Sequence, residues 1–224
     1  MKIGIIGTGN MGRSIGIVVS KLGHDVFFGA RNPEGSTLAV SLSRGALAGS
    51  NDEAAAFGEV IIYTPRDVDP ATVLSDVSLL SGKIVIDCAN QEVPSDLHFP
   101  VVATAIAEKL AHRIPAAHVV KAFNTLPMEV FEHCPIEIRK YNVAAFVAAD
   151  DSAAKTTVMA LAAEMGFRAV DCGGLYQAKL LESAADLIRL LIIGGGLPLA
   201  NFSITDVPPS TQNLLGGRQT SKLK

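Results

Sequence analysis

The sequence predicts an α/β protein built on a doubly wound, mainly parallel sheet, with a smaller helical portion at its C-terminal end. Short β-branched apolar segments alternate with segments of helical spacing along most of the 224 residues. That alternation is typical of strand-helix-strand units joined by right-handed crossovers. Hydrophobic residues make up 49% of the chain and aromatic residues only 5%. Such a composition suits a parallel sheet that helices cover on both faces.

Charge, hydropathy and cysteine content exclude several classes of protein. The net charge is −3 and no basic run precedes the last few residues, so nucleic acid is not an expected partner. The most apolar late stretch, 187–199, contains Arg189 and three glycines and is too interrupted to span a membrane. Cys88, Cys134 and Cys172 form no CxxC pair and no metal-ligand spacing. We therefore expect no metal site and a reducing, cytoplasmic location.

The opening of the chain carries the most informative motif, Gly7-x-Gly9-x-x-Gly12, between a predicted strand over 2–6 and a predicted helix over 11–22. Gly7 permits a sharp turn out of the strand, and Gly9 lacks the Cβ that would keep a pyrophosphate away from the backbone. Gly12 lets the helix lie close to the sheet. Because a helix N-terminus carries unpaired N–H donors and a partial positive charge, the motif predicts a Rossmann-type dinucleotide site. A tight turn that binds nothing is the alternative.

The end of the second predicted strand, over 25–29, indicates which dinucleotide is bound. NAD-binding proteins place a carboxylate there for the adenosine 2′-hydroxyl. In this chain Asp25 comes too early, and Ala30, Arg31 and Asn32 follow the strand. A guanidinium can hold a 2′-phosphate through charge-assisted hydrogen bonds. We therefore predict NADP, with a solvated loop arginine as the alternative for Arg31.

The remaining elements follow from apolar strand segments, from helix-capping residues and from the glycines and prolines that end helices. They are, in chain order, a helix over 33–44 started by Pro33, an extended piece over 45–50, a helix capped by Asn51-Asp52-Glu53 and ended by Gly58, a strand over 59–65, a helix over 69–80, a strand over 82–90, a helix from 99 or 100 to 113, a strand over 118–125, a short helix over 127–134, a strand over 141–149, a helix over 153–165 and a strand over 167–173.

Strand ends locate the predicted crevice, because loops at the carboxyl ends of parallel strands line the cofactor site. Thr64 and Pro65 are expected beside the adenosine or ribose, and Ala89 and Asn90 near the nicotinamide half. Cys88 has no neighbouring His or Lys that would activate it, so we interpret it as a small buried residue.

The last third of the chain contains a predicted long helix over 175–193 with two distinct stripes. Apolar residues form one stripe, Leu180, Ala184, Leu187 and Leu191, and charged residues form the other, Lys179, Glu182, Asp186 and Arg189. The charged stripe is interpreted as a solvated face with intrahelical pairs, or alternatively as a subunit seam. An edge strand over 202–207 and a polar tail over 208–224 complete the chain. The predicted division is 1–126 as the dinucleotide-binding domain, 127–207 as a smaller C-terminal α/β portion, and the tail.

Taken together, five motifs resemble the deazaflavin-dependent NADP oxidoreductases, a family similar to the cytosolic reductase domain of the six-transmembrane ferric reductases. The motifs are Gly7-Thr8-Gly9-Asn10-Met11-Gly12, Gly29-Ala30-Arg31-Asn32-Pro33, Asp87-Cys88-Ala89-Asn90, Val120-Lys121-Ala122-Phe123-Asn124-Thr125 and Asp171-Cys172-Gly173-Gly174-Leu175. The resemblance covers Lys2 to about Leu197. It implies an NADP-binding domain, a C-terminal portion that closes over the nicotinamide, usually a homodimer, and direct hydride transfer between NADPH and a flavin-like ring.

The resemblance also implies roles for particular residues. Thr8, Asn10 and Met11 are expected at the diphosphate, Arg31 at the 2′-phosphate, and Ala89 and Asn90 at the nicotinamide. The family commonly has Ser at the position of Ala30 and a second basic residue where this chain has Glu34-Gly35. A weaker NADP preference is therefore expected. The full predicted cofactor site comprises Gly7, Thr8, Gly9, Asn10, Met11, Gly12, Ala30, Arg31, Asn32, Thr64, Pro65, Ala89 and Asn90.

The predicted function is an NADPH-dependent oxidoreductase with a flavin or deazaflavin acceptor. Hydride transfer between two rings needs stacking and exclusion of water more than acid–base groups. The strand ends offer Thr64, Asn90, Asn124 and Thr125 and no evident His or Lys proton donor, which disfavours a carbonyl-reducing dehydrogenase. No residue is assigned as catalytic. The alternatives are an imine or small-carbonyl reductase whose proton comes from water or substrate, and a non-catalytic NADP sensor.

Overall fold

The computed structural model describes residues 1–32 and 36–208, and within them eight strands form one sheet in the order β3-β2-β1-β4-β5-β6-β7-β8. The strands are β1 Lys2–Ile6, β2 Asp25–Gly29, β3 Leu47–Gly49, β4 Val60–Tyr63, β5 Ile84–Asp87, β6 His118–Ala122, β7 Ala144–Ala149 and β8 Arg168–Asp171. All neighbouring strands are parallel except β6 and β7. The chain leaves β1 toward β2 and β3 and then returns to the other side with β4. This reversal opens a crevice at the carboxyl ends of β1 and β4, and the predicted fold class is confirmed.

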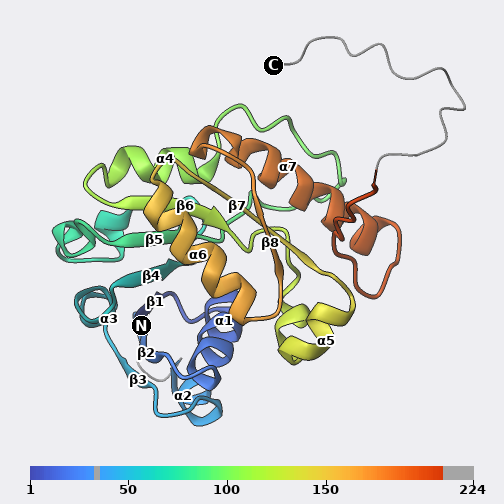
Figure 1. The fold of residues 1–224 in the computed structure, drawn as a ribbon. Coiled ribbons are helices and arrows are strands. Elements are labelled where there is room, and N and C mark those ends of the chain that lie inside the picture. The colour runs from blue at the N-terminus through green and yellow to red at the C-terminus, as the bar shows by residue number, and fades with distance from the viewer. Residues whose placement is uncertain (33–35, 209–224) are drawn as a thin grey trace, which may run out of the picture.

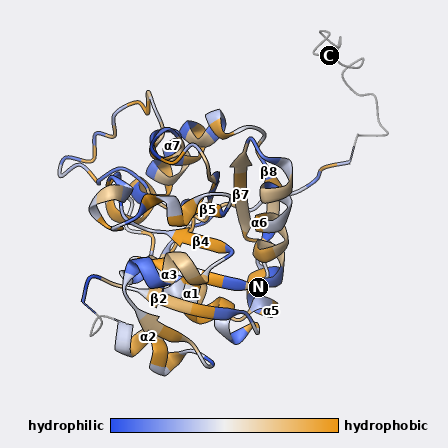
Figure 2. Cartoon of the chain, turned by 90° about the vertical axis from the view of Figure 1, so that its left-hand side faces the viewer, coloured by the Kyte–Doolittle hydropathy of each residue, from blue (hydrophilic) through white to orange (hydrophobic). Residues whose placement is uncertain are grey.

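Helices cover both faces of the sheet (Figure 1). They are α1 Asn10–Lys21, α2 Thr37–Leu42, α3 Asn51–Phe57, α4 Ile106–Arg113, α5 Pro135–Lys140, α6 Ser152–Glu164 and α7 Ala178–Arg189. Buried side chains of α1, α2, α5 and α6 share one core with the sheet, and those of α3, α4 and the start of α7 share the other. Figure 2 shows the most hydrophobic stretches in the strands between these helices. The sheet therefore buries apolar side chains on both faces.

The sheet crosses the predicted domain boundary at residue 126 without a break, since β7 pairs with β6. The division of the chain there stays a prediction. Pro33, Glu34 and Gly35 lie outside the described residues, and so does the predicted tail from residue 209 onward. The helix predicted over 33–44 is described only as the shorter α2, which ends at Leu42.

The helix predicted over 69–80 is wrong. Two 3-10 turns, Pro70–Thr72 and Val77–Leu80, occupy this segment instead. The side chains of Asp69 and Asp76 accept the N–H groups of Ala71 and Ser78, each two residues later. Such local hydrogen bonds compete with a continuous helix.

The helix predicted from 99 or 100 begins only at Ile106. The N–H of Ala105 donates to Glu108 at 2.9 Å, and the N–H of Ile106 donates to the Glu182 carboxylate at 2.8 Å. These acceptors satisfy the first N–H groups of α4, so the helix begins where they can reach it. The preceding residues form an irregular segment in which Val101 is exposed.

Three smaller corrections concern helix caps and an edge strand. Ser50, rather than the predicted Asn51, caps α3 through a reciprocal capping box with Glu53. The helix predicted over 127–134 is a 3-10 turn, Met128–Glu132, and α5 follows it unpredicted, with Pro135 in its first turn. In the described part of 202–207 the predicted strand is limited to one bridge between Val143 and Ser203.

The long helix predicted over 175–193 is divided into a 3-10 turn Leu175–Gln177, the α-helix α7, and a π-helical turn Leu190–Gly194. Its orientation is the reverse of the one predicted. Glu182 and Asp186 are only 1% and 6% exposed, whereas Leu180 and Leu187 are 65% and 46% exposed. The prediction of a solvated charged stripe is wrong for Glu182 and Asp186. Glu182 faces the buried ammonium of Lys121, and Asp186 forms an intrahelical pair with Arg189, as predicted, but away from solvent.

Candidate functional site

The glycine turn after β1 has a geometry that only glycine fits at two of its three positions. Gly7 has φ +92°, and a Cβ there would lie 2.5 Å from Thr64 Oγ1. A Cβ at Gly12 would lie 2.1 Å from the Gly7 carbonyl oxygen. The Thr64 hydroxyl lies 3.0 Å from the Gly7 carbonyl oxygen and 3.1 Å from that of Ile6, so it can donate to them. Thr64, predicted as a ribose or adenosine neighbour, therefore supports the turn itself, with Pro65 half-buried beside it.

Gly9 differs, because a Cβ there would meet no atom within 4 Å. It precedes α1 without a side-chain cap, and the first turn of α1 contains no acid. The helices α3 and α6 differ in this respect. Ser50 caps the N-terminus of α3, whose first turn contains Glu53, and Asp151 caps the N-terminus of α6. The start of α1 thus presents unpaired N–H groups and an uncompensated dipole to an open space, as an anion site requires.

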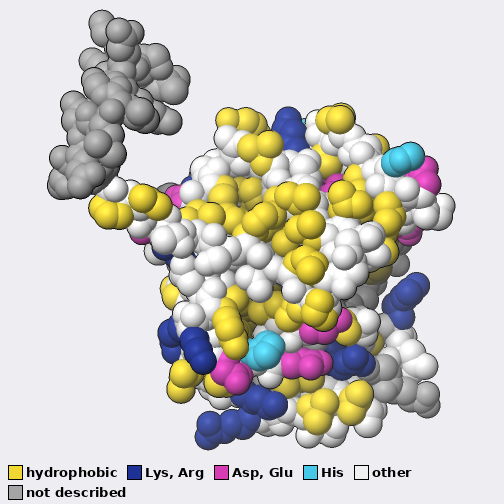
Figure 3. Space-filling view, turned by 90° about the vertical axis from the view of Figure 1, so that its right-hand side faces the viewer, with side chains coloured by type: hydrophobic (Ala, Val, Ile, Leu, Met, Phe, Trp, Pro, Cys, Tyr) yellow, Lys and Arg dark blue, Asp and Glu magenta, His cyan; other side chains and the backbone are white. Residues whose placement is uncertain are grey.

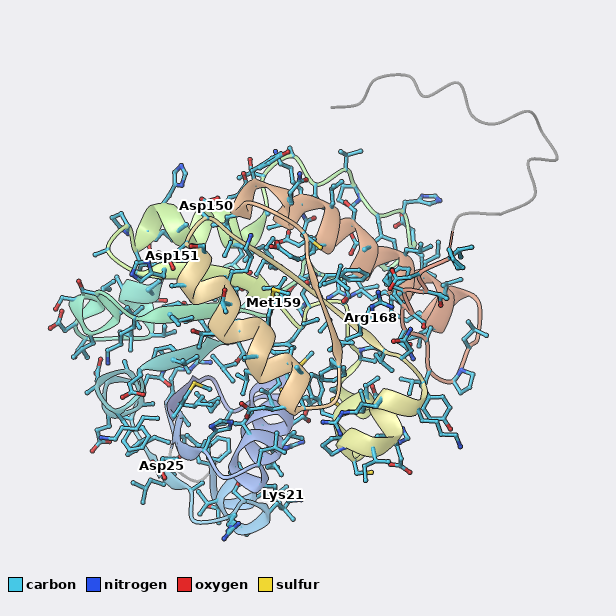
Figure 4. The ribbon with its side chains drawn as sticks, viewed as in Figure 1. Lys21, Asp25, Asp150, Asp151, Met159 and Arg168 are labelled. Atoms are coloured by element: carbon cyan, nitrogen blue, oxygen red, sulfur yellow. The ribbon has the colours of Figure 1, made fainter. Side chains whose placement is uncertain are left out.

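The end of β2 lies beside this turn. The N–H of Gly7 donates to the Gly29 carbonyl at 3.3 Å, and that of Ala30 to the Gly49 carbonyl at 3.0 Å. Ala30 is buried, whereas Arg31 and Asn32 are exposed. Figure 4 shows Asp25 at the start of β2, at the other end of the strand. Arg31 thus lies at the crevice edge, where the sequence predicts a contact with the 2′-phosphate.

A second part of the crevice lies over the ends of β5 and β6. It contains a cavity of about 170 Å³ lined by Met11, Asn90, Asn124, Thr125, Leu126, Pro127, Met128, Ala185, Ile188, Arg189 and Ile192. Met11 and Asn90, both predicted site residues, meet there. Thr8 is half-buried and Asn10 is exposed at the start of α1.

Two amide side chains are locked together in this cavity. Asn90 Nδ2 donates to the Asn124 carbonyl at 2.6 Å, and Asn124 Nδ2 donates to Asn90 Oδ1 and to the Leu181 carbonyl, both at 2.9 Å. Asn124 Oδ1 is buried without a hydrogen-bond partner among the described residues. A buried unpaired acceptor is costly unless a ligand supplies a donor.

Phe123 aims Asn124 into the cavity through an unusual backbone conformation. It is fully buried and has φ +63°, a region that bulky residues rarely occupy. Its ring packs against Phe131 and Phe167, with centroids 6.4 Å apart in each pair. Strain of this kind persists only where the surrounding packing fixes it, and it gathers at functional sites.

A larger, polar cavity of about 570 Å³ borders the same loop after β5. It is lined by Thr64, Arg66, Asp67, Gln91, Glu92, Ile106 and Lys109. Asp67 forms ion pairs with Lys109 at 2.6 Å and with Arg113 at 3.3 Å. The two cavities therefore flank the successive residues Asn90 and Gln91.

Sequence reasoning missed a buried charge network beneath the small cavity. Lys121 Nζ lies 2.7 Å from Asp87 Oδ2 and 2.8 Å from Glu182 Oε1, and it also donates to the Ala89 carbonyl. All three charged side chains are buried. Asp87 and Lys121 face each other in the register of β5 and β6, and two opposite charges inside adjacent apolar strands could have indicated the pair.

The pKa values of two groups in this network are shifted by their surroundings. Burial acts to lower the pKa of Lys121, but the carboxylates of Asp87 and Glu182 outweigh it and raise that pKa. Burial raises the pKa of Glu182, and Lys121 only partly opposes it. The two pKa values thus rise for different reasons: the neighbouring carboxylates raise that of Lys121, whereas burial, with a smaller contribution from Asp87, raises that of Glu182. Lys121 is therefore charged and fully occupied as a donor.

Other chemistry is limited in the described part of the chain. Burial raises the pKa of the Cys88 thiol, in agreement with a small buried residue. The side chains described in 1–32 and 36–208 contain no cluster of three or more His, Cys, Asp or Glu that could hold a metal. No helix among those residues is long and apolar enough to cross a membrane.

The sheet order, the glycine turn and the crevice define a Rossmann protein of the dinucleotide-binding type. Residues 2–91 match the family described as "NADP oxidoreductase coenzyme F420-dependent". Metalloreductase STEAP3 of Rattus norvegicus is 32% identical over 191 residues, which cover 85% of this chain and 37% of the rat protein. The F420-dependent NADP reductase of Methanocaldococcus jannaschii is 27% identical over 228 residues, 91% of this chain and 100% of that protein.

Solved structures share the fold. A protein from Arthrobacter sp. FB24, provisionally described as an F420-dependent NADP reductase, superposes with a TM-score of 0.80 at 25% identity over 92% of this chain and all of its own. An imine reductase of Streptomyces aurantiacus shares the fold, with a TM-score of 0.65 at 15% identity, covering 87% of this chain and 64% of that one.

These comparisons confirm the predicted resemblance: the chain is a homologue of the F420-dependent NADP reductases and of the STEAP metalloreductases. It spans less than two fifths of the metalloreductases it matches, 37% to 39% of their length. The predicted enzyme class, an NADP-dependent oxidoreductase, and the predicted cofactor agree with these homologues. The assignments of individual site residues stay predictions.

Proposed function

We propose that the protein is an NADPH-dependent oxidoreductase that passes a hydride directly between the nicotinamide and a flavin or deazaflavin acceptor. The lining of the small cavity is the main support. Its polar groups are the Asn90 and Asn124 amides, the Thr125 hydroxyl and the Arg189 guanidinium, with no His, Lys or carboxylic acid among its described lining residues. Transfer between two rings needs no side-chain proton donor, whereas reduction of a carbonyl does.

The residues present fit the nucleotide. The open space at Gly9 and the uncapped start of α1 suit the diphosphate, and Arg31 suits the 2′-phosphate. The unpaired Asn124 Oδ1 suits the amide N–H of a carboxamide. When bound, the nicotinamide supplies the hydride. Asn90 and Asn124 orient the ring, and Met11, Ile188 and Ile192 exclude water from it.

The acceptor is proposed to enter from the larger, polar cavity. Its volume of about 570 Å³ is typical of small-molecule sites. Gln91 lines this cavity and Asn90 lines the small one, so a ring entering from the larger cavity would approach the nicotinamide at this loop. The acceptor assignment also draws on the F420-dependent homologues.

Deuterium transfer tests the proposal directly. The full chain is incubated with NADPH deuterated at C4 and with a deazaflavin or a flavin in ordinary water. We expect loss of NADPH absorbance and, for the deazaflavin, deuterium on its ring carbon. With NADPH deuterated at both C4 positions, loss of absorbance without deuterium in the deazaflavin product would contradict direct transfer. A reduced flavin exchanges its N–H with water and reports turnover only. Tight NADPH binding without turnover on any acceptor would instead support the non-catalytic sensor.

We also infer a homodimer that forms through the outer face of α7. Leu180 and Leu187 are exposed there, and Leu191 and Ile193 extend the apolar surface beyond the helix. Phe146, Cys172 and Leu180 help to line a hollow of about 320 Å³ at this face. Broad hydrophobic surfaces also appear on the side of the molecule seen in Figure 3. Apolar surface of this extent is typical of protein interfaces.

A cytoplasmic location is part of the same proposal. Cys88, Cys134 and Cys172 are all free thiols. Unpaired cysteines are typical of a reducing compartment.

A further inference from the structure

We propose that the buried carboxylates of Asp87 and Glu182 stabilise the oxidised, cationic nicotinamide relative to the reduced, neutral one. In this role they are positioning residues that set the redox balance of the bound cofactor without touching it. The inference rests on the proposed function, because it requires NADP in the small cavity.

The first observation is the charge count. The network contains two carboxylates and one ammonium, and all three groups are buried. At a pH above the raised pKa of Glu182, where both carboxylates are ionised, one negative charge is in excess where little water can screen it. Glu182 Oε2 is buried and has no hydrogen-bond partner among the described residues. One of the two carboxylate oxygens of Glu182 therefore receives no hydrogen bond from the described part of the protein.

The second observation is the short connection from this network to the cavity. Lys121 Nζ donates to the carbonyl of Ala89, and the next residue, Asn90, lines the cavity. On α7, the carbonyl of Leu181 accepts from Asn124 Nδ2, and Glu182 is the next residue. The excess charge therefore lies directly behind the two amides proposed to hold the nicotinamide.

Other charges near the cavity do not cancel this excess. Arg189 lines the cavity, but its Nη1 lies 3.3 Å from Asp186 Oδ1, so the two form a neutral pair. Arg189 also donates to the Gln91 carbonyl at 2.7 Å. Arg66 is exposed and lines the larger, polar cavity, where solvent screens its charge.

The chemical consequence follows from the charges of the two nicotinamide states. The oxidised ring carries a positive charge and the reduced ring carries none, so an excess buried anion favours the oxidised ring. A protein that binds the oxidised form more tightly lowers the reduction potential of the bound couple. Bound NADPH thereby becomes a stronger hydride donor.

The Glu182→Gln variant isolates the charge. Gln keeps the oxygen that accepts from Lys121 and from the Ile106 N–H. Calorimetric titration of the full chain gives Kd for NADP⁺ and for NADPH separately. We expect the ratio Kd(NADP⁺)/Kd(NADPH) to rise about 5- to 10-fold. For a two-electron couple, tenfold corresponds to about 30 mV. Asp87→Asn is the second variant and shifts the ratio in the same direction.

Glu108→Gln is the matched control. This half-buried glutamate also accepts an N–H at the start of α4, yet it lies outside the network. In this variant we expect the ratio Kd(NADP⁺)/Kd(NADPH) to stay at the wild-type value. Equal weakening of both nucleotides in the folded Glu182 and Asp87 variants would show a structural role only and overturn the inference, as would an unchanged ratio. Absence of any nucleotide binding by the wild-type chain would overturn the proposed function and this inference together.

Discussion

Lys121 Nζ lies 2.7 Å from Asp87 Oδ2, in register across two central strands and fully shielded from solvent. Glu182 reaches the same ammonium from α7. This contact connects the sheet to the helix that closes the proposed nicotinamide pocket, so the stability of the fold and the shape of the site depend on the same three side chains.

Replacing Lys121 by an uncharged residue should therefore lower the free energy of unfolding. Lys121→Met leaves two buried carboxylates without a cation, and we expect a loss of about 3–5 kcal/mol in the free energy of unfolding. Urea denaturation measures it. Lys109→Met is the control, because its ion pair with Asp67 is partly exposed and should contribute at most about 1 kcal/mol. Similar losses in the two variants would contradict a specific role for the buried network.

The free energy of unfolding should depend on pH in part through Glu182. Its pKa is raised in the folded state above the ordinary value of 4.5, mainly by burial. The folded chain therefore binds more protons than the unfolded chain from about pH 4.5 up to the raised pKa, and stability contributed by this group falls as pH rises through that window. Relative to wild type, Glu182→Gln should gain stability across it. Urea denaturation at a series of pH values measures the difference, and a difference independent of pH would contradict the assignment.

Two glycines of the opening turn should respond differently to alanine. Gly7→Ala introduces a Cβ at φ +92° against Thr64 and should cost about 1–3 kcal/mol of stability. Gly9→Ala meets no protein atom, so unfolding should change little. Both NADPH and NADH should nevertheless bind about tenfold more weakly, because the new methyl group occupies the proposed diphosphate position. Unchanged nucleotide affinity in a folded Gly9→Ala protein would argue against that position.

Recognition of the 2′-phosphate is tested at Arg31. Arg31→Ala should weaken binding of NADPH by about 1–3 kcal/mol and leave binding of NADH nearly unchanged. Fluorescence titration with both nucleotides measures this selectivity. Arg44→Ala removes another exposed arginine and should affect neither. A loss shared equally by NADPH and NADH would mean that the 2′-phosphate is held elsewhere.

Dimerisation is tested on the outer face of α7. The pair Leu180→Glu and Leu187→Glu should convert the dimer to monomer in sedimentation velocity, because charges in an apolar interface lack partners. Leu38→Glu, on α2, is an equally exposed control that should leave the dimer intact. Asp186 is unsuitable for this purpose because it is buried and paired with Arg189. A persistent dimer in the double variant would place the interface on another face.

Much of the fold and part of the site could be predicted because their determinants are local. The β-branched segments specify the strands, and the Gly7-x-Gly9-x-x-Gly12 spacing specifies the turn and places Met11 at the crevice. The strand end at Asn90 could be located in the same way. Predicted helix boundaries were wrong in two situations. Asp69 and Asp76 form local hydrogen bonds that compete with a continuous helix. The start of α4 depends on an acceptor that is distant in the sequence, Glu182.

The amino-acid sequence by itself determined the layered α/β architecture, the glycine turn after the first strand and the resemblance to the F420-dependent NADP reductases, because short-range patterns of glycine and apolar residues suffice for each. Only the tertiary structure decided which face of α7 is buried. Periodicity alone favoured a solvated charged stripe, yet Glu182 and Asp186 are buried, and Leu180 and Leu187 are exposed. The reason lies in buried hydrogen-bond donors: Glu182 accepts from Lys121 Nζ and from the Ile106 N–H, and both donors would lose this acceptor if α7 turned its leucines inward.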